Sequence, residues 1–281
     1  MLFRRIKQSI KACYETFRYG GYKQCNVSYI TDGNRLNGKR ILITGGASGI
    51  GYAIAQQCIK EGANVVITGR NEDKLQTACL SNGNNSHLKY IVWDISKPMQ
   101  NEDKINKVVN LFGADIDILV NNAGVQPYEF FPNVTESEWN RIYETNSKGT
   151  FFLSQSIAKH WNNNKVNNSH KIINISSQGG FVGATYPYRM SKWDIVGLTE
   201  GLAKTLIKDG IIVNGIAPGV IKTAMQSKFF AQANNVYCEQ NPAERYAFPE
   251  EIAELAVWLM SDLSNFIVGQ TILCDGGFSL K

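Results

Sequence analysis

The sequence lacks several features that would point to particular classes of protein. No run of it reaches the roughly 18 apolar residues that a membrane-spanning helix needs. Its three histidines and six scattered cysteines show neither close pairing nor a spacing typical of metal ligands. Unpaired thiols in a chain without a secretory signal are typical of a reducing cytosol. We therefore expect a cytoplasmic protein without a bound metal.

Positive charge is confined to the start of the chain. The net charge is +5, and residues 1–23 hold six basic residues against Glu15 alone, whereas the other 23 basic and 23 acidic residues cancel. The neutral net charge of the remaining residues argues against nucleic acid binding by the folded body. Any electrostatic attraction to an anionic partner would therefore come from residues 1–23.

This leading segment has the pattern of an amphipathic helix that Gly20-Gly21 would end. We expect its apolar stripe to pack on the protein's own body or on a partner subunit. The alternatives are peripheral contact of residues 1–23 with an anionic membrane surface and a cleaved transit peptide. The apolar residues recur at steps of three and four: Phe3, Ile6, Ile10, Cys13 and Phe17.

The rest of the chain alternates strand-like and helix-like segments, and no internal repeat interrupts it. With 281 residues and 43% hydrophobic content, the chain can bury one full core. The alternation predicts an α/β fold: a single-domain, Rossmann-type, doubly wound parallel sheet of about seven strands with helices on both faces. The predicted strands are 40–44, 64–68, 88–92, 116–121, 171–176, 211–217 and 270–273.

A glycine-rich turn, residues 44–51, follows the first predicted strand and precedes a helical pattern at 52–59. A strand, a glycine turn and a helix are the usual context of a phosphate-binding turn. Glycine lets the backbone turn tightly and approach a pyrophosphate, which binds the free amides at the positive end of a helix. The segment therefore predicts a dinucleotide site.

Arg70 bears on which dinucleotide binds. It follows the second predicted strand, roughly 20 residues beyond the glycine turn, where this kind of fold contacts the adenine-side ribose. An acidic residue there would accept a hydrogen bond from a 2′-hydroxyl, whereas the planar cation of arginine suits a 2′-phosphate. We therefore predict NADP(H), with NAD(H) the less favoured alternative.

Tyr188 and Lys192 form a candidate proton-transfer pair. Residues four apart lie on one face of a helix, so the ammonium can reach the neighbourhood of the phenol. A phenol has a pKa of about 10, and a nearby cation can lower it toward neutrality. Tyr186 is a rival phenol, but Met190, four residues on, offers no cation.

Ser177 is the candidate hydroxyl of the same site. It comes at the end of another apolar strand, and the carboxyl ends of parallel strands face the crevice where such sheets bind ligands.

With these residues in view, the chain resembles the short-chain dehydrogenase/reductase family over about residues 38–281, in particular its NADP-preferring, 3-oxoacyl reductase-like branch. Further matches are Asp94 after the third strand, residues 121–124 after the fourth, Asn146, and residues 218–223 and 275–277. One departure is that the interval from Ser177 to Tyr188 is about two residues shorter than is usual in the family. Ser176 therefore stays open as an alternative catalytic serine.

The resemblance implies a dinucleotide-binding catalytic domain at 38–281, preceded by a basic extension at 1–37. The enzyme would transfer a hydride between NADP(H) and a carbonyl or secondary alcohol, with Tyr188 as general acid or base. Its implied catalytic residues are Asn146, Ser177, Tyr188 and Lys192. Its implied cofactor contacts are Gly45, Ser48, Gly49, Ile50, Gly51, Arg70, Asp94, Ile95, Asn122, Tyr188, Lys192, Ile221 and Thr223.

The family also implies a homodimer or homotetramer, with helices near 135–165 and 188–208 at the interface. The substrate is predicted only as a small carbonyl or alcohol, with residues 224–247 as a cover over its pocket. Lys228 and Arg245 are candidate anion contacts there.

The alternative functions are a catalytically silent dinucleotide sensor and a scaffold at a membrane surface.

Overall fold

The computed structural model describes residues 6–7, 9–10, 13–14, 33–83, 85–164, 169–222, 238 and 241–280. The chain divides into two compact units, Met1–Ile30 and Thr31–Lys281. In the first unit, the six described residues have helical backbone. The second unit contains all the strands described below, and its Leu36 is fully buried. The predicted division between residues 37 and 38 stays a prediction.

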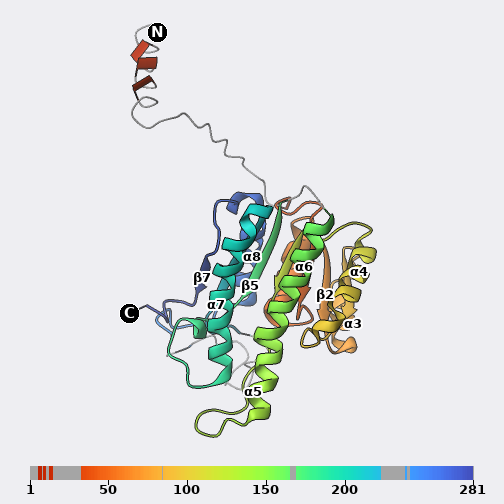
Figure 1. Ribbon diagram of the computed structural model, residues 1–281, viewed down its shortest axis with the longest axis vertical. Coiled ribbons are helices and arrows are strands. Elements are labelled where there is room, and N and C mark those ends of the chain that lie inside the picture. The colour runs from red at the N-terminus through yellow and green to blue at the C-terminus, as the bar shows by residue number, and fades with distance from the viewer. Residues whose placement is uncertain are drawn as a thin grey trace. The chain divides into compact units, whose positions relative to one another are not determined.

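Seven parallel strands form one sheet in the order β3-β2-β1-β4-β5-β6-β7 (Figure 1). The order reverses direction between β1 and β4, where crossovers to either side leave a crevice at the carboxyl ends of the strands. The predicted doubly wound fold is therefore confirmed. The strands are β1 (Arg40–Thr44), β2 (Asn64–Gly69), β3 (Leu88–Val92), β4 (Ile118–Asn121), β5 (His170–Ile175), β6 (Ile211–Pro218) and β7 (Thr271–Cys274).

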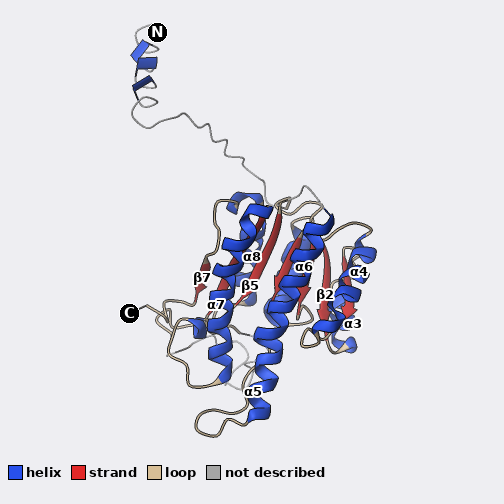
Figure 2. Ribbon diagram, in the orientation of Figure 1, coloured by secondary structure: helices blue, strands red, loops and turns tan. Residues whose placement is uncertain are grey.

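Helices cover both faces of the sheet (Figure 2). On one face α2 (Gly49–Lys60), α3 (Glu72–Ser81) and α8 (Pro249–Met260) pack on alternate strand residues such as Ile41 and Ile43. On the other, α4 (Asn101–Phe112), α6 (Thr150–Asn164) and α7 (Pro187–Leu206) pack on the residues between them, such as Leu42. Burial on both faces explains why these strands read as continuous apolar runs.

Shorter helical segments complete the fold. The helix α5 (Glu136–Tyr143) leads through the π-helical turn η2 (Glu144–Gly149) into α6. Single 3-10 turns are η1 (Pro98–Gln100), η3 (Gln178–Gly180), η4 (Ile207–Asp209) and η6 (Asp262–Ser264). Among the described residues, no helix combines the length and the apolar character that crossing a bilayer requires.

A chain of buried polar side chains joins β4 and β5 to the helices above them. Asn121 Nδ2 donates to Ser154 Oγ and to Asn174 Oδ1, both at 2.9 Å, and Asn174 Nδ2 donates to Thr199 Oγ1 at 3.0 Å. Asn121 and Asn174 are direct register partners in the sheet. Because buried amides are costly without partners, these bonds fix how β4, β5, α6 and α7 align.

Lys171, near the amino end of β5, is a second buried polar group. Its Nζ donates to the Leu259 and Ser261 carbonyls at 3.3 and 2.5 Å, and to Ser264 Oγ at 3.3 Å. Burial lowers the pKa of this lysine to about 8. The ammonium thus satisfies carbonyls at the carboxyl end of α8, where a helix favours positive charge.

Candidate active site

The glycine turn after β1 is fixed by close packing against the loop after β4. Gly45 has a φ of +64°, and a Cβ there would lie 2.8 Å from Ala123 Cα. A Cβ on Gly51 would lie 2.4 Å from Asn122 Nδ2 and 2.5 Å from the Gly45 carbonyl oxygen. Side chains are therefore excluded at both positions by the protein itself.

Thr44 and Asn122 bond the two loops together. The Thr44 hydroxyl accepts from the backbone N–H groups of Asn122 and Ala123, both at 3.0 Å. The Asn122 amide donates to the carbonyls of Thr44 at 2.9 Å and Gly45 at 3.0 Å. Asn122 was predicted as a cofactor contact, and the structure also gives it this bracing role, which places the turn at the crevice.

The amino end of α2 provides donors for an anion. Ser48 precedes the helix in an extended conformation, and its side chain makes no capping hydrogen bond. Gly49 begins the helix with a φ of +56°. The free amides of a first helical turn and a hydroxyl not used for capping suit a pyrophosphate. The residues present therefore fit the phosphates of a dinucleotide.

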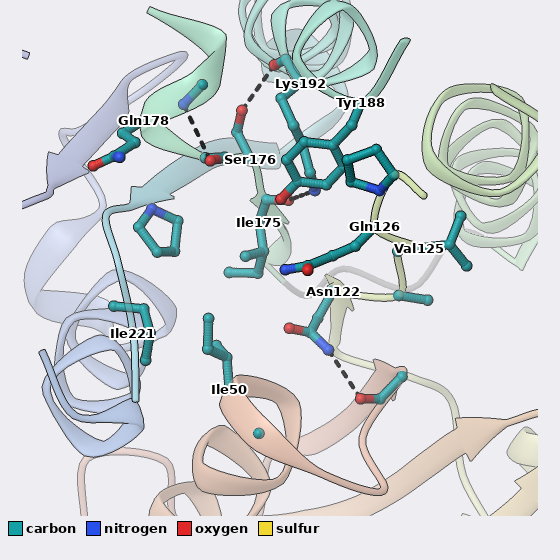
Figure 3. Close-up of a pocket in the computed structure, with 18 of the residues that line it drawn as sticks. Ile50, Asn122, Val125, Gln126, Ile175, Ser176, Gln178, Tyr188, Lys192 and Ile221 are labelled. Atoms are coloured by element: carbon teal, nitrogen blue, oxygen red, sulfur yellow. Dashed lines mark hydrogen bonds between the residues drawn. The ribbon is translucent and has the colours of Figure 1, made fainter. Parts of the chain in front are cut away.

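A cavity of about 470 Å³ opens at the carboxyl ends of the strands (Figure 3). Its walls come from the glycine turn, the loop after β4, the end of β5, the start of α7 and the end of β6. The fold thus gathers segments far apart in the sequence around one space. The predicted site residues that line it are Gly45, Ser48, Gly49, Ile50, Asn122, Ser177, Tyr188, Lys192 and Ile221.

The other predicted cofactor residues lie elsewhere. Arg70 is exposed beside Gly69, which lines the cavity. Asp94 Oδ1 accepts from the backbone N–H and the hydroxyl of Ser96, at 3.1 and 2.8 Å. Ile95 is buried in the core under α4 and α6. Thr223 lies outside the described residues.

Tyr188 and Lys192 both lie near the start of α7 and face the cavity (Figure 3). Lys192 Nζ is 5.7 Å from the centroid of the Tyr188 ring and donates to the Ile175 carbonyl at 3.0 Å. Burial lowers the pKa of Lys192 to about 8. The predicted spatial pairing of phenol and amine is present.

The direction of the Tyr188 pKa differs from the sequence-based expectation. Burial raises the pKa of this phenol above its usual 10, and a hydrogen bond with Ser177 opposes the rise. Lys192 is not among the groups that shift the pKa of Tyr188, and its own charge is disfavoured by burial. The predicted lowering by the lysine is therefore wrong for this geometry, because desolvation outweighs a cation drawn toward Ile175.

Ser176 and Ser177 are distinguished by their partners. The Ser176 hydroxyl is buried and donates to the Lys192 backbone carbonyl at 2.8 Å, which ties the end of β5 to α7. Ser177 Oγ accepts a hydrogen bond from the Gly179 N–H at 3.1 Å. Its own hydroxyl proton can therefore be donated toward Tyr188, with which it shares a hydrogen bond. This geometry favours Ser177 for chemistry and Ser176 for support.

Asn146 occupies the π-helical turn η2 and holds the cavity wall. Its Oδ1 accepts from the Val125 N–H at 2.8 Å, and its Nδ2 donates to the Val125 carbonyl at 3.1 Å and to Ser191 Oγ at 3.2 Å. Single π-helical turns are frequent at functional sites. The sequence around Asn146 has no proline or other signal that would have predicted this turn.

Arg245 does not lie where the sequence suggested. Its guanidinium forms a two-point ion pair with Glu251, at 2.8 and 2.7 Å, and it is absent from the cavity wall. The carboxylate at the start of α8 thus neutralises the predicted anion contact. Four other residues of this predicted cover, Lys228, Phe229, Phe230 and Tyr237, lie outside the described residues.

Comparisons with known proteins agree with this geometry. The sequence profile of a family described as Enoyl-(Acyl carrier protein) reductase matches residues 45–279. The chain is 33% identical over 254 residues to the 3-oxoacyl-[acyl-carrier-protein] reductase FabG of Aquifex aeolicus, covering 86% of this chain and 98% of that one. It is 34% identical over 249 residues to the 5-keto-D-gluconate 5-reductase of Escherichia coli (strain K12), covering 86% and 96%.

A solved structure is similar over the same region. The Pseudomonas aeruginosa RhlG/NADP active-site complex superposes with a TM-score of 0.81 at 29% identity, covering 89% of this chain and 100% of that one. Profile, relatives and fold all point to the same family. The chain therefore belongs to the short-chain dehydrogenase/reductase family. It is an oxidoreductase that transfers a hydride between a nicotinamide dinucleotide and its substrate.

Proposed function

We propose that the protein reduces a small carbonyl compound with NADP(H), using Tyr188 as general acid and Ser177 and Lys192 in support. The observation that carries this proposal is that these three side chains share one cavity with the glycine turn and the amino end of α2. A phosphate-binding turn and a proton donor thus lie on the walls of the same space.

The cofactor would bind along the glycine turn. Gly45, Ser48, Gly49 and Ile50 would hold the pyrophosphate and Asn122 and Ile221 would flank it. When bound, the nicotinamide supplies the hydride. Arg70 supports NADP(H) over NAD(H), because its guanidinium has no carboxylate partner among the described residues and suits a 2′-phosphate.

The state of Tyr188 suits reduction. A phenol whose pKa is raised stays protonated at neutral pH, so it can donate its proton to the carbonyl oxygen as charge develops there. Ser177 would donate a hydrogen bond to the same oxygen, which accelerates reaction only to the extent that this bond strengthens in the transition state.

Lys192 and Asn146 would position rather than react. The Lys192 ammonium, already bonded to the Ile175 carbonyl, has further donors for the cofactor ribose. Asn146 holds Val125 and Ser191, so it keeps the loop after β4 at a fixed distance from α7. For an alcohol substrate the same proton transfer runs in reverse.

The test is NADPH oxidation against a panel of carbonyl compounds, including a 3-oxoacyl thioester and 5-keto-D-gluconate. Tyr188→Phe keeps the ring and removes the proton, so turnover should fall by about 10²- to 10⁴-fold, as for loss of a general acid. NADPH binding, followed by fluorescence, should be retained. A fully active Tyr188→Phe variant would refute the role of the phenol.

We also propose that the protein is a homodimer or homotetramer. Among the described residues, α6 and α7 expose large apolar side chains, namely Phe151, Phe152 and Trp193, at 43, 38 and 47%. Both helices fall within the ranges predicted for an interface. Light scattering of the purified protein tests this, and a monomeric mass at micromolar concentration would overturn it.

A further inference from the structure

The charges on the cavity wall are all of one sign. Among the described residues that line the cavity, the charged side chains are Lys192 and Arg189, and none is a carboxylate. Lys192 is accounted for by its bond to the Ile175 carbonyl and by its proposed cofactor contact. Arg189 has no assigned role, although it follows Tyr188 directly in α7.

Arg189 differs from most other arginines of the described body in having no acidic partner. Arg35, Arg40, Arg141 and Arg245 each form an ion pair with an aspartate or glutamate. The two described arginines outside this set are Arg70, at the predicted 2′-phosphate position, and Arg189. Both are close to the carboxyl edge of the sheet, where the substrates bind.

The guanidinium of Arg189 is held in place without being neutralised. Its Nη1 donates to the Gly183 carbonyl at 3.1 Å, and its central carbon lies 5.4 Å from the Tyr186 ring centroid. The Tyr186 ring in turn packs edge-on against Phe130 at 4.9 Å. A guanidinium has five N–H donors, so this arrangement leaves donors for a ligand.

The stem of Arg189 passes close to the proposed reaction centre. A Cβ placed on Gly179 would lie 3.1 Å from Arg189 Cγ and 3.5 Å from Ser177 Oγ. The arginine stem and the serine hydroxyl therefore both border the small space that a side chain at Gly179 would fill. An anion bound by Arg189 would belong to the same small molecule whose oxygen meets Ser177.

We propose that Arg189 binds an anionic group of the substrate, a carboxylate or a phosphate ester, so that the protein acts on small oxo acids or phosphorylated ketones. This rests on the proposed carbonyl reduction, in which Tyr188 and Ser177 contact the carbonyl oxygen. Neutral ketones and steroids would leave the Arg189 charge without a partner. The guanidinium thus selects substrates by charge, while Phe130 and Tyr186 bound the apolar side.

The experiment compares matched pairs of probes that differ in charge. One pair is 4-oxopentanoate and its methyl ester, and the other is dihydroxyacetone phosphate and dihydroxyacetone. Each is tested for NADPH oxidation and for binding by calorimetry, with the wild type, Arg189→Gln and Lys204→Gln. Lys204→Gln removes the same charge from an exposed position on the same helix.

We expect the wild type to prefer the charged member of at least one pair. Arg189→Gln should raise the KM and the Kd for that member by roughly 10- to 100-fold, the range for hydrogen bonds to charged groups, and leave the neutral member unchanged. Lys204→Gln should change neither. The carboxylate and phosphate pairs show which anion the site takes.

Two results would overturn the proposal. One is an unchanged ratio of charged to neutral substrate in Arg189→Gln. The other is an equal loss of kcat for both members of a pair, which would mean that Arg189 only supports Tyr186. If NADPH is oxidised with none of the four probes in any variant, the proposed reduction is at fault, and the calorimetric comparison still decides the role of Arg189.

Discussion

A buried lysine lies at each end of β5, Lys171 within the strand and Lys192 reaching its carboxyl end from α7, and the two differ in whether they support the fold or the reaction. Burial lowers the pKa of both Lys171 and Lys192 to about 8. Lys171, at the amino end, bonds two carbonyls and the Ser264 hydroxyl, so all three of its donors are used. Lys192, at the carboxyl end, donates to one acceptor among the described residues, the Ile175 carbonyl, and faces the cavity.

The two lysines differ in the hydrogen-bond acceptors around them, because burial lowers the pKa of both to a similar value. A buried ammonium whose donors are all satisfied stabilises the helix end it contacts. A buried ammonium with donors left over is poised for a ligand. The amino edge of the sheet therefore serves the fold, and the carboxyl edge serves the reaction.

Exchanging each lysine for methionine gives the largest expected effects. Lys192→Met should lower the rate of NADPH-dependent reduction by about 10²-fold or more, because the ammonium that would position the cofactor ribose is lost, with little loss of stability. Lys171→Met should leave kcat per folded molecule unchanged and lower the free energy of unfolding by about 1–3 kcal/mol, because buried acceptors lose their partner. Steady-state kinetics and urea unfolding measure the two effects. A variant that lost both kcat and stability to a similar extent would contradict the proposed difference between the two ends of β5.

Arg70 tests the cofactor side of the carboxyl edge. Arg70→Asp should shift the ratio of kcat/KM for NADPH over NADH toward NADH by roughly 10- to 100-fold, because a carboxylate repels a 2′-phosphate and accepts from a 2′-hydroxyl. Arg70→Lys is the matched control that keeps the charge. Unchanged discrimination in the aspartate variant would show that the cofactor is recognised elsewhere.

Gly51 tests whether packing or the ligand demands a glycine at this edge. Gly51→Ala should weaken NADPH binding and lower the free energy of unfolding by about 2 kcal/mol, as overpacking does, since its Cβ would lie 2.4 Å from Asn122 Nδ2. Gly201→Ala, at an exposed position of α7 with open space around it, should instead be neutral or slightly stabilising. Thermal unfolding with and without NADPH distinguishes them. A Gly51→Ala protein as stable as the wild type would contradict the packing argument.

The pH profile tests the charge of Lys192. Lys192 releases its proton as pH rises through about 8, whereas burial raises the pKa of Tyr188 and so favours its protonated form. Reduction should therefore slow above pH 8, by at most about tenfold per pH unit if the ammonium is required. Lys171→Met should show the same profile as the wild type. A rate that stays constant to pH 10 would mean that the charge of Lys192 is dispensable.

Much of the fold could be predicted because its five central strands are buried on both faces. The predicted and observed strands agree within two residues at either end. The glycine turn and the spacing of Tyr188 and Lys192 could also be predicted, because these constraints act between residues close in sequence. Their places after the predicted strands β1 and β5 also predicted that they would meet at the carboxyl edge of the parallel sheet.

The remainder depends on contacts between distant segments. Lys171 looks exposed in the sequence, yet α8 buries it. The pairing of Arg245 with Glu251, the π-helical turn at Asn146 and the direction of the Tyr188 pKa likewise follow from packing that no local pattern encodes. No local pattern marks Arg189, which stands out because the cavity wall holds no carboxylate among the described residues.

The linked amides of Asn121 and Asn174 have a consequence for how the chain reaches its native state. A slip of β5 by one residue against β4 would turn Asn174 toward the other layer and break its hydrogen bonds with Asn121 and Thr199. Apolar strands alone would tolerate such a slip, since isoleucine and valine fit either face. The hydrogen-bonded chain therefore favours the native register of β5 against β4.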